Sequence, residues 1–220
     1  MEQPGVAVDV TVVDDASTDD SADVAGRLVQ THGIRLLRHA TNAGYISSYN
    51  EALALADGEF VIKLDADDTL PRGSIARATA LLDAHPEVGF VYGRPFHFTE
   101  PDAVPPSGTV LRWQVWSGYT WLDRRCRSGL NCSSNPEVVM RRSVLEQIGY
   151  LRPELRHTCD LEPWLRLAAV ADVGRVQGPF QGATGCTKAA CSARSTQGCS
   201  PISAAAVTPS RPSSRMHRAI

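Results

Sequence analysis

The sequence predicts an α/β fold with a mostly parallel sheet and helices on both faces. One observation is a series of short apolar runs, such as VDVTVV at 8–13 and EFVIKL at 59–64, which are typical of buried strands. A second is that segments with helical spacing separate these runs, as in chains whose parallel strands are joined by crossover helices. A third is that carboxylates follow both of the quoted runs, where open α/β sheets bind ligands.

Local signals in the first half of the chain set the limits of these elements. Ser17 and Asp20 form a box-like helix start, and Gly33 is a typical helix stop. Pro71 suits the first turn of a later helix, whose apolar residues share one face. We therefore expect strands at 8–13, 34–37, 59–64 and 88–92, and helices at 17–33, 46–56 and 71–85.

The second half shows weaker periodicity. Residues 94–135 contain prolines, glycines and three tryptophans, which suggests loops over a cleft. These tryptophans either stack on a ring of a bound ligand or pack the loops. Beyond them we expect strands at 138–140 and 174–176 and helices at 143–148 and 161–170. The tryptophans are Trp113, Trp116 and Trp121.

Composition limits the class of protein. The 220 residues are enough for one domain with a sizeable core, and the formal net charge is −2. No basic block is present, so nucleic acid is not an expected partner. No apolar run reaches the roughly 18 residues that a membrane span needs. The six cysteines form no CxxC pair, which favours a reduced, cytoplasmic protein without a zinc site.

The stretch LDADDTL at 64–70 crowds three carboxylates at a strand end. Positions two apart point the same way in an extended chain, so Asp65 and Asp67 can converge on one point. A divalent cation, Mg²⁺ or Mn²⁺, would relieve their repulsion and could hold a diphosphate in turn. The alternative is that Asp67 or Asp68 caps the following helix.

Asp14 and Asp15 form a second acidic pair, at the end of the 8–13 strand. Acids at two strand ends are also compatible with a phospho-acceptor receiver domain. Such a domain needs a lysine after its last core strand, whereas Lys63 precedes the acids here. A signalling domain is therefore the weaker interpretation.

Four segments together resemble the family 2 glycosyltransferases, which have the nucleotide-diphosphosugar transferase fold. VVDDASTDDS is similar to the strand-two motif of the family. The run from RHATNAG to LDADDTLPRGSI resembles its Asn-x-Gly segment, helix, strand and Asp-x-Asp motif. SVLEQIGYLRPEL and HTCDLEPWLRLA are like its acceptor half. The resemblance extends from about Val8 to Gly182, with all four motifs in the family order.

The resemblance implies a sugar transfer from a nucleoside-diphosphate donor to a hydroxyl acceptor, with inversion and with Mg²⁺ or Mn²⁺. Asp65 and Asp67 would ligate the metal. Asp160 would be the catalytic base that takes the proton of the acceptor, although it is equally well placed to cap the helix that starts at Leu161. The implied nucleotide-binding residues are Asp14, Asp15, Asn42, Gly44 and Asp65.

The chain departs from the family pattern at several points. Cys159 stands where the family usually has Glu before the catalytic Asp, and Tyr49 stands where it has Arg before Asn50. The family's first strand and helix have no counterpart, so residues 1–182 are expected to form a transferase domain without them. Two alternatives follow: a non-catalytic nucleotide-sugar-binding remnant, or a sugar-phosphate nucleotidyltransferase. The second would open with a Gly-rich phosphate loop, which this chain lacks.

Residues 183–220 contain no Leu, Phe, Tyr, Trp, Asp or Glu. Such a segment buries little apolar surface and is expected to be disordered. Reading the codons for 183–187 one nucleotide earlier permits Tyr-Arg-Val-His, which the family carries at this place. We therefore expect an out-of-frame tail after about Gly182, and a chain that is inactive as it stands.

Overall fold

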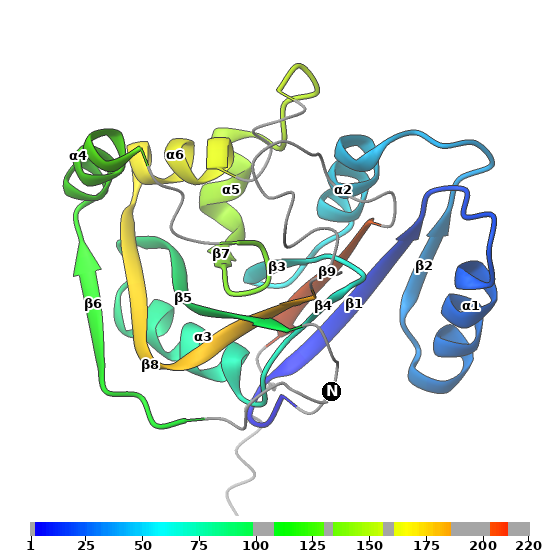
Figure 1. Cartoon of the computed structure of the whole chain (residues 1–220), viewed down its shortest axis with the longest axis horizontal. Helices are drawn as coiled ribbons and strands as arrows, with labels where there is room; N and C mark the ends of the chain where they lie inside the picture. The colour runs from blue at the N-terminus through cyan, green and yellow to red at the C-terminus, as the bar shows by residue number, and fades with distance from the viewer. Residues whose placement is uncertain (1–2, 99–107, 130–133, 156–160, 186–202, 211–220) are drawn as a thin grey trace, which may run out of the picture.

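The computed structural model describes residues 3–98, 108–129, 134–155, 161–185 and 203–210. These residues confirm the predicted α/β class, because one sheet carries helices on both faces (Figure 1). The strands are β1 Ala7–Asp14, β2 Arg35–Arg38, β3 Phe60–Leu64, β4 Asp68–Thr69, β5 Val88–Phe98, β6 Arg112–Trp116, β7 Val139–Arg141, β8 Asp172–Gly185 and β9 Ser203–Ser210. The helices are α1 Ser21–His32, α2 Tyr45–Ala54, α3 Ser74–Ala84, α4 Gly118–Ser128, α5 Arg142–Ile148 and α6 Leu161–Val170.

The sheet is mixed rather than mostly parallel, which corrects that part of the prediction. Its strand order is β2-β1-β9-β3-β7-β5-β8-β4, with β6 paired to β8. Strands β1, β2, β3, β5 and β8 all run in one direction, but β9 separates β1 from β3, and β7 separates β3 from β5. The alternation of strands and helices predicted the five strands that share a direction. It could not show that antiparallel strands lie between them.

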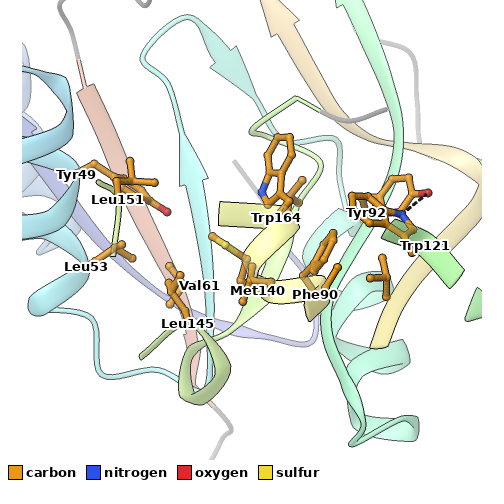
Figure 2. Packing of buried hydrophobic residues seen from close by; sticks show 14 residues of the cluster. Tyr49, Leu53, Val61, Phe90, Tyr92, Trp121, Met140, Leu145, Leu151 and Trp164 are labelled. Atoms are coloured by element: carbon orange, nitrogen blue, oxygen red, sulfur yellow. Dashed lines mark hydrogen bonds between the residues drawn. The ribbon is translucent and has the colours of Figure 1, made fainter. Parts of the chain in front are cut away.

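Two hydrophobic clusters lie on opposite faces of the sheet. In β3, Phe60, Ile62 and Leu64 pack with α3, while Val61 between them packs on the other face. This alternation is the period-two pattern of a strand that is buried on both sides. Figure 2 shows the cluster on the face of Val61, which includes Tyr49, Leu53, Phe90, Tyr92, Trp121, Met140, Leu145, Leu151 and Trp164.

Strand β9 differs from the expected disorder of the tail. Residues 203–210 lie antiparallel between β1 and β3, where Val12 and Leu64 both pair with Ala205 (Figure 1). The two neighbours run in the same direction and leave facing backbone groups unpaired, so a strand between them satisfies both. Strand β8 also continues to Gly185, beyond the expected boundary at 182. The change of reading frame and the loss of activity stay predictions.

Two helices begin later than predicted. Helix α1 starts at Ser21, because Ser17 lies in a turn where its backbone N–H donates to Asp14 Oδ1 at 3.1 Å. Helix α3 starts at Ser74 after Gly73, so neither Asp67 nor Asp68 caps it. The helix-cap alternative for the acidic stretch is therefore wrong.

The tryptophans occupy regular elements instead of loops. Trp121 lies in α4 and is 1% exposed, with its indole N–H donating to Tyr92 Oη at 3.4 Å. Trp116 in β6 stacks on the Tyr92 ring at a centroid distance of 6.3 Å. Trp113 on the same strand is 40% exposed. Packing therefore explains Trp116 and Trp121, and only Trp113 presents much of its ring to solvent.

Candidate functional site

Asp14 closes β1 and shapes the turn that follows. Its buried carboxylate accepts hydrogen bonds from Ser17 N at 3.1 Å and from Arg38 Nε at 3.2 Å. Burial opposes ionisation, but these hydrogen bonds and the Arg38 charge hold the pKa of Asp14 below its ordinary value. In the turn between Asp14 and Ser17, Ala16 has a left-handed φ of 60°. Non-glycine residues rarely adopt this conformation outside functional sites and tight turns.

Asp15 fastens the loop that leads into α2. Its Oδ1 accepts the backbone N–H of Ala43 at 2.7 Å, and its Oδ2 accepts that of Gly44 at 2.8 Å. Asn42 Nδ2 lies 3.5 Å from the Asp15 carbonyl oxygen. Gly44 has φ +88°, so a residue with a Cβ would be strained there. The structure thus brings together Asp15, Asn42 and Gly44, three of the predicted nucleotide-binding residues.

The carboxylate of Asp15 is directed into the protein. Its side chain is 2% exposed, and both of its oxygens are already hydrogen-bonded. Burial opposes ionisation, whereas His39 and the two backbone N–H groups favour it and hold the pKa of Asp15 below its ordinary value. The geometry therefore makes Asp15 a residue that shapes the loop from inside the protein. Asn42 and Gly44 lie nearer to the protein surface than Asp15.

Asp65 lies at the end of β3 between the amide N–H of Asn135 and the ammonium group of Lys63. Asn135 Nδ2 donates to Asp65 Oδ2 at 2.9 Å, and Lys63 Nζ lies 3.3 Å from Asp65 Oδ1. Lys63 is itself buried, with its ammonium 4.4 Å from the centre of the Tyr45 ring. Lys63 and Asn135 were missed as site residues. The alternation of β3 could have placed Lys63 beside Asp65, but no sequence signal links Asn135 to it.

Asp67 and Asp68 differ sharply in their surroundings. Asp67 is exposed, whereas Asp68 in β4 is buried and its Oδ1 has no hydrogen-bond partner among the described residues. Burial, together with the charges of Asp65 and Asp67, raises the pKa of Asp68 to about 8. Glu137 is also buried, and burial raises its pKa although both of its oxygens accept hydrogen bonds from Ser134.

Asp68→Asn is expected to stabilise the fold at high pH. Asp68 ionises near pH 4 when unfolded and near pH 8 when folded. The folded state therefore binds more protons between these values, and stability falls as the pH rises through that window. The neutral amide should raise the free energy of unfolding at pH 8.5 by on the order of 1–3 kcal/mol, and by less at pH 5.

Urea denaturation at both pH values, followed by circular dichroism, measures this gain. Asp57→Asn, at an exposed aspartate, is the control and should leave the pH dependence unchanged. An Asp68→Asn protein that is no more stable at pH 8.5 than the original chain would contradict the prediction.

The acidic groups lie at the same end of two strands that run in one direction. Strands β1 and β3 run in the same direction on either side of β9, so Asp14, Asp15 and Asp65 follow neighbouring strand ends. A hollow of about 710 Å³ opens on the α1 and α3 side of β1, and Asp65, Ala66 and Asp68 line one end of it. Its apolar wall is formed by Val8, Val10, Val12, Leu28, Ile34 and Leu70.

Two predicted features remain open at this site. Among the described residues, no group of three or more His, Cys, Asp or Glu is arranged to hold a metal by itself. Asp160 lies outside the described residues, as does Cys159. Trp164, a few residues further, is 3% exposed and belongs to the core. No helix in the described part of the chain is both long and apolar enough for a membrane crossing.

Comparison with known families decides the relationship of the chain. The model of glycosyl transferase family 2 matches residues 1–149. The chain belongs to glycosyl transferase family 2. This confirms the resemblance that the four motifs predicted, and it sets aside the receiver-domain interpretation.

Known proteins are similar to parts of the chain. An uncharacterised protein of Mycobacterium tuberculosis, MT1568, is 28% identical over 185 residues, which cover 76% of this chain and 54% of that protein. A PGL/p-HBAD biosynthesis glycosyltransferase of Mycobacterium bovis is 33% identical over 87 residues, which cover 39% and 34%. The chain therefore matches only about half, or less, of the length of these relatives.

Solved structures share the fold. TarS 1-349 of Staphylococcus aureus, in complex with UDP-GlcNAc, has a TM-score of 0.62 at 19% identity, covering 82% of this chain and 50% of TarS 1-349. The mannosyltransferase PcManGT of Pyrobaculum calidifontis, in complex with GDP-Man and Mn²⁺, has a TM-score of 0.56 at 22% identity, covering 88% and 57%. Both likenesses confirm the nucleotide-sugar transferase type of fold.

Proposed function

We propose that this chain binds a nucleoside-diphosphate sugar where β1 and β3 end, and that its sugar is transferred to a hydroxyl acceptor with inversion. The observation that carries this proposal is that the loop fastened by Asp15 and the Asp65 carboxylate lie at the same end of β1 and β3, at one edge of the sheet. Open α/β sheets bind ligands at such an edge. Membership of glycosyl transferase family 2 supports the same reaction class.

Asp65 and Asp67 suit a divalent cation. Mg²⁺ and Mn²⁺ commonly take one or two protein carboxylates and complete their shell with water and substrate phosphates, so a cluster of three ligands is not required. Asp67 is exposed, and within the described part of the chain the buried Oδ1 of Asp68 has no hydrogen-bond partner. When bound, the cation would stabilise the charge of the departing nucleoside diphosphate. The Mn²⁺ in the mannosyltransferase complex supports this proposal.

The residues of the chain itself have separate roles in the proposed reaction. The loop at 42–44 would contact the nucleotide, held in shape by Asp15 and continued on the other side by Asp14. Lys63 and Asn135 fix the orientation of Asp65. Asp160 would take the proton of the acceptor hydroxyl as its oxygen attacks the anomeric carbon from the side opposite the diphosphate, which gives inversion.

Removing the outer carboxylate of the metal pair tests the proposal. Mn²⁺ is expected to tighten the binding of uridine or guanosine diphosphate on the order of tenfold, relative to binding with a chelator present. Asp67→Asn should abolish this gain without unfolding the protein, because Asp67 is exposed. Titration calorimetry measures the three dissociation constants.

Asp57→Asn is the matched control, since it removes an exposed carboxylate elsewhere and should retain the gain. Equal binding with Mn²⁺, with chelator and in Asp67→Asn would contradict the metal site. Nucleotide binding without any sugar transfer would favour the non-catalytic remnant.

A further inference from the structure

His39 lies between two carboxylates at the end of β2. Its Nδ1 is 2.7 Å from Asp15 Oδ1, and its Nε2 is 3.0 Å from Glu51 Oε2 on α2. A neutral imidazole has a single N–H and would turn its lone pair toward one of these carboxylates. Only the doubly protonated ring donates to both, so the geometry selects the imidazolium form.

The surroundings of His39 favour its charge. Its side chain is 14% exposed. The hydrogen bonds to Asp15 and Glu51 outweigh burial and raise the pKa of His39 above its ordinary value. Among the described residues, these two carboxylates, from the end of β1 and from α2, are the charged groups facing the ring. The nearby Arg38 is paired with Asp14 instead.

The His39 ring forms a hydrogen bond to the same Asp15 oxygen that holds the loop at 42–44. Asp15 Oδ1 accepts both His39 Nδ1–H and the N–H of Ala43, while Oδ2 accepts the N–H of Gly44. The carboxylate therefore has little freedom to rotate while His39 is protonated. When the ring loses a proton it also loses its positive charge. The hydrogen bond to Asp15 is then either lost or no longer charge-assisted from the ring, depending on which nitrogen keeps its proton, so the fixing of Asp15 weakens in both cases.

We propose that protonated His39 is a positioning residue, which locks Asp15 and the loop at 42–44 in the shape that binds the donor nucleotide. This inference rests on the proposed function. Because the pKa is raised, the lock is complete below about pH 6.5, the ordinary value for histidine, and is lost as the pH rises through the folded-state pKa. Donor affinity should therefore fall with rising pH.

Nuclear magnetic resonance tests the lock without any nucleotide. The His39 ring carbons and nitrogens report its protonation, and the amides of Ala43 and Gly44 report the loop. We expect both amides to shift with the same midpoint as the His39 ring. Glu51→Gln removes one carboxylate charge and should move this common midpoint to lower pH.

Titration calorimetry with uridine or guanosine diphosphate, in chelator, tests the effect on donor binding. Between pH 6.5 and 9 the affinity should weaken roughly tenfold, as expected for losing a hydrogen bond to a charged group. His39→Gln should bind weakly at all pH values and lack this dependence. His85→Gln, in a second His–Glu pair at 2.9 Å, should behave like the original chain. The ionisation of the nucleotide phosphate is common to all variants and cancels in the comparison.

An unchanged pH profile in His39→Gln would overturn the proposal, as would loop amides that do not follow the His39 titration. A chain that binds no nucleotide at any pH, while these amides still follow His39, would overturn the donor site itself and support the lock on the loop. The two failures are therefore distinguishable.

Discussion

Asp160→Asn is expected to lower the rate of sugar transfer by about 10²- to 10⁴-fold, the usual effect of removing a general base. The amide has nearly the same shape but cannot accept the proton of the acceptor hydroxyl. Donor binding should change little, because the proposed donor contacts come from the ends of β1 and β3. The drop should therefore appear in kcat with an almost constant dissociation constant for the nucleoside diphosphate.

Turnover is to be measured as the release of nucleoside diphosphate from a nucleoside-diphosphate sugar in the presence of a hydroxyl acceptor. Glu154→Gln, at an exposed carboxylate just before the same region, is the control and should keep turnover within about twofold. Near-normal turnover in Asp160→Asn would mean that another group takes the proton. Cys159→Glu, which restores the usual family residue, measures how far that departure limits the rate.

The parts of the fold that depend on short stretches of chain were predictable from the sequence. The alternation in β3 puts Phe60 and Ile62 on one face and Val61 on the other, which the apolar run at 59–64 predicts. The same period places Lys63 and Asp65 side by side, where the structure has their ion pair. The placement of Asp14, Asp15 and Asp65 at the same side of the sheet was also predictable, because strands joined by crossover helices run in the same direction.

Features that depend on contacts between distant segments were not predictable. Asp15 accepts hydrogen bonds from the backbone N–H groups of Ala43 and Gly44. Because every residue type except proline has such an N–H, the sequence of the loop does not reveal this contact. The places of β7 and β9 between parallel neighbours depend on which open edges remain after the other strands pair. The start of α1 shifted because Asp14 competes for the backbone of Ser17, which a capping pattern alone cannot show.

Trp121→Ala is expected to destabilise the fold by about 3–5 kcal/mol, as is typical for removing a large aromatic side chain from a core. Trp121 is 1% exposed, and its ring meets Phe90 edge to face at 5.5 Å. It also packs edge to face on Tyr92 at 6.4 Å and donates its N–H to Tyr92 Oη (Figure 2). The alanine would leave a cavity and a lost hydrogen bond within the cluster that supports β5 and α4.

Urea denaturation followed by circular dichroism measures the loss. Trp113→Ala is the matched control, because Trp113 is 40% exposed on β6 and should cost no more than about 1 kcal/mol. Trp121→Phe keeps an aromatic ring and loses the N–H donor, so it should fall between the two. If Trp121→Ala costs no more than Trp113→Ala, Trp121 does not belong to the core, and the sugar-stacking role would become the better explanation of this residue.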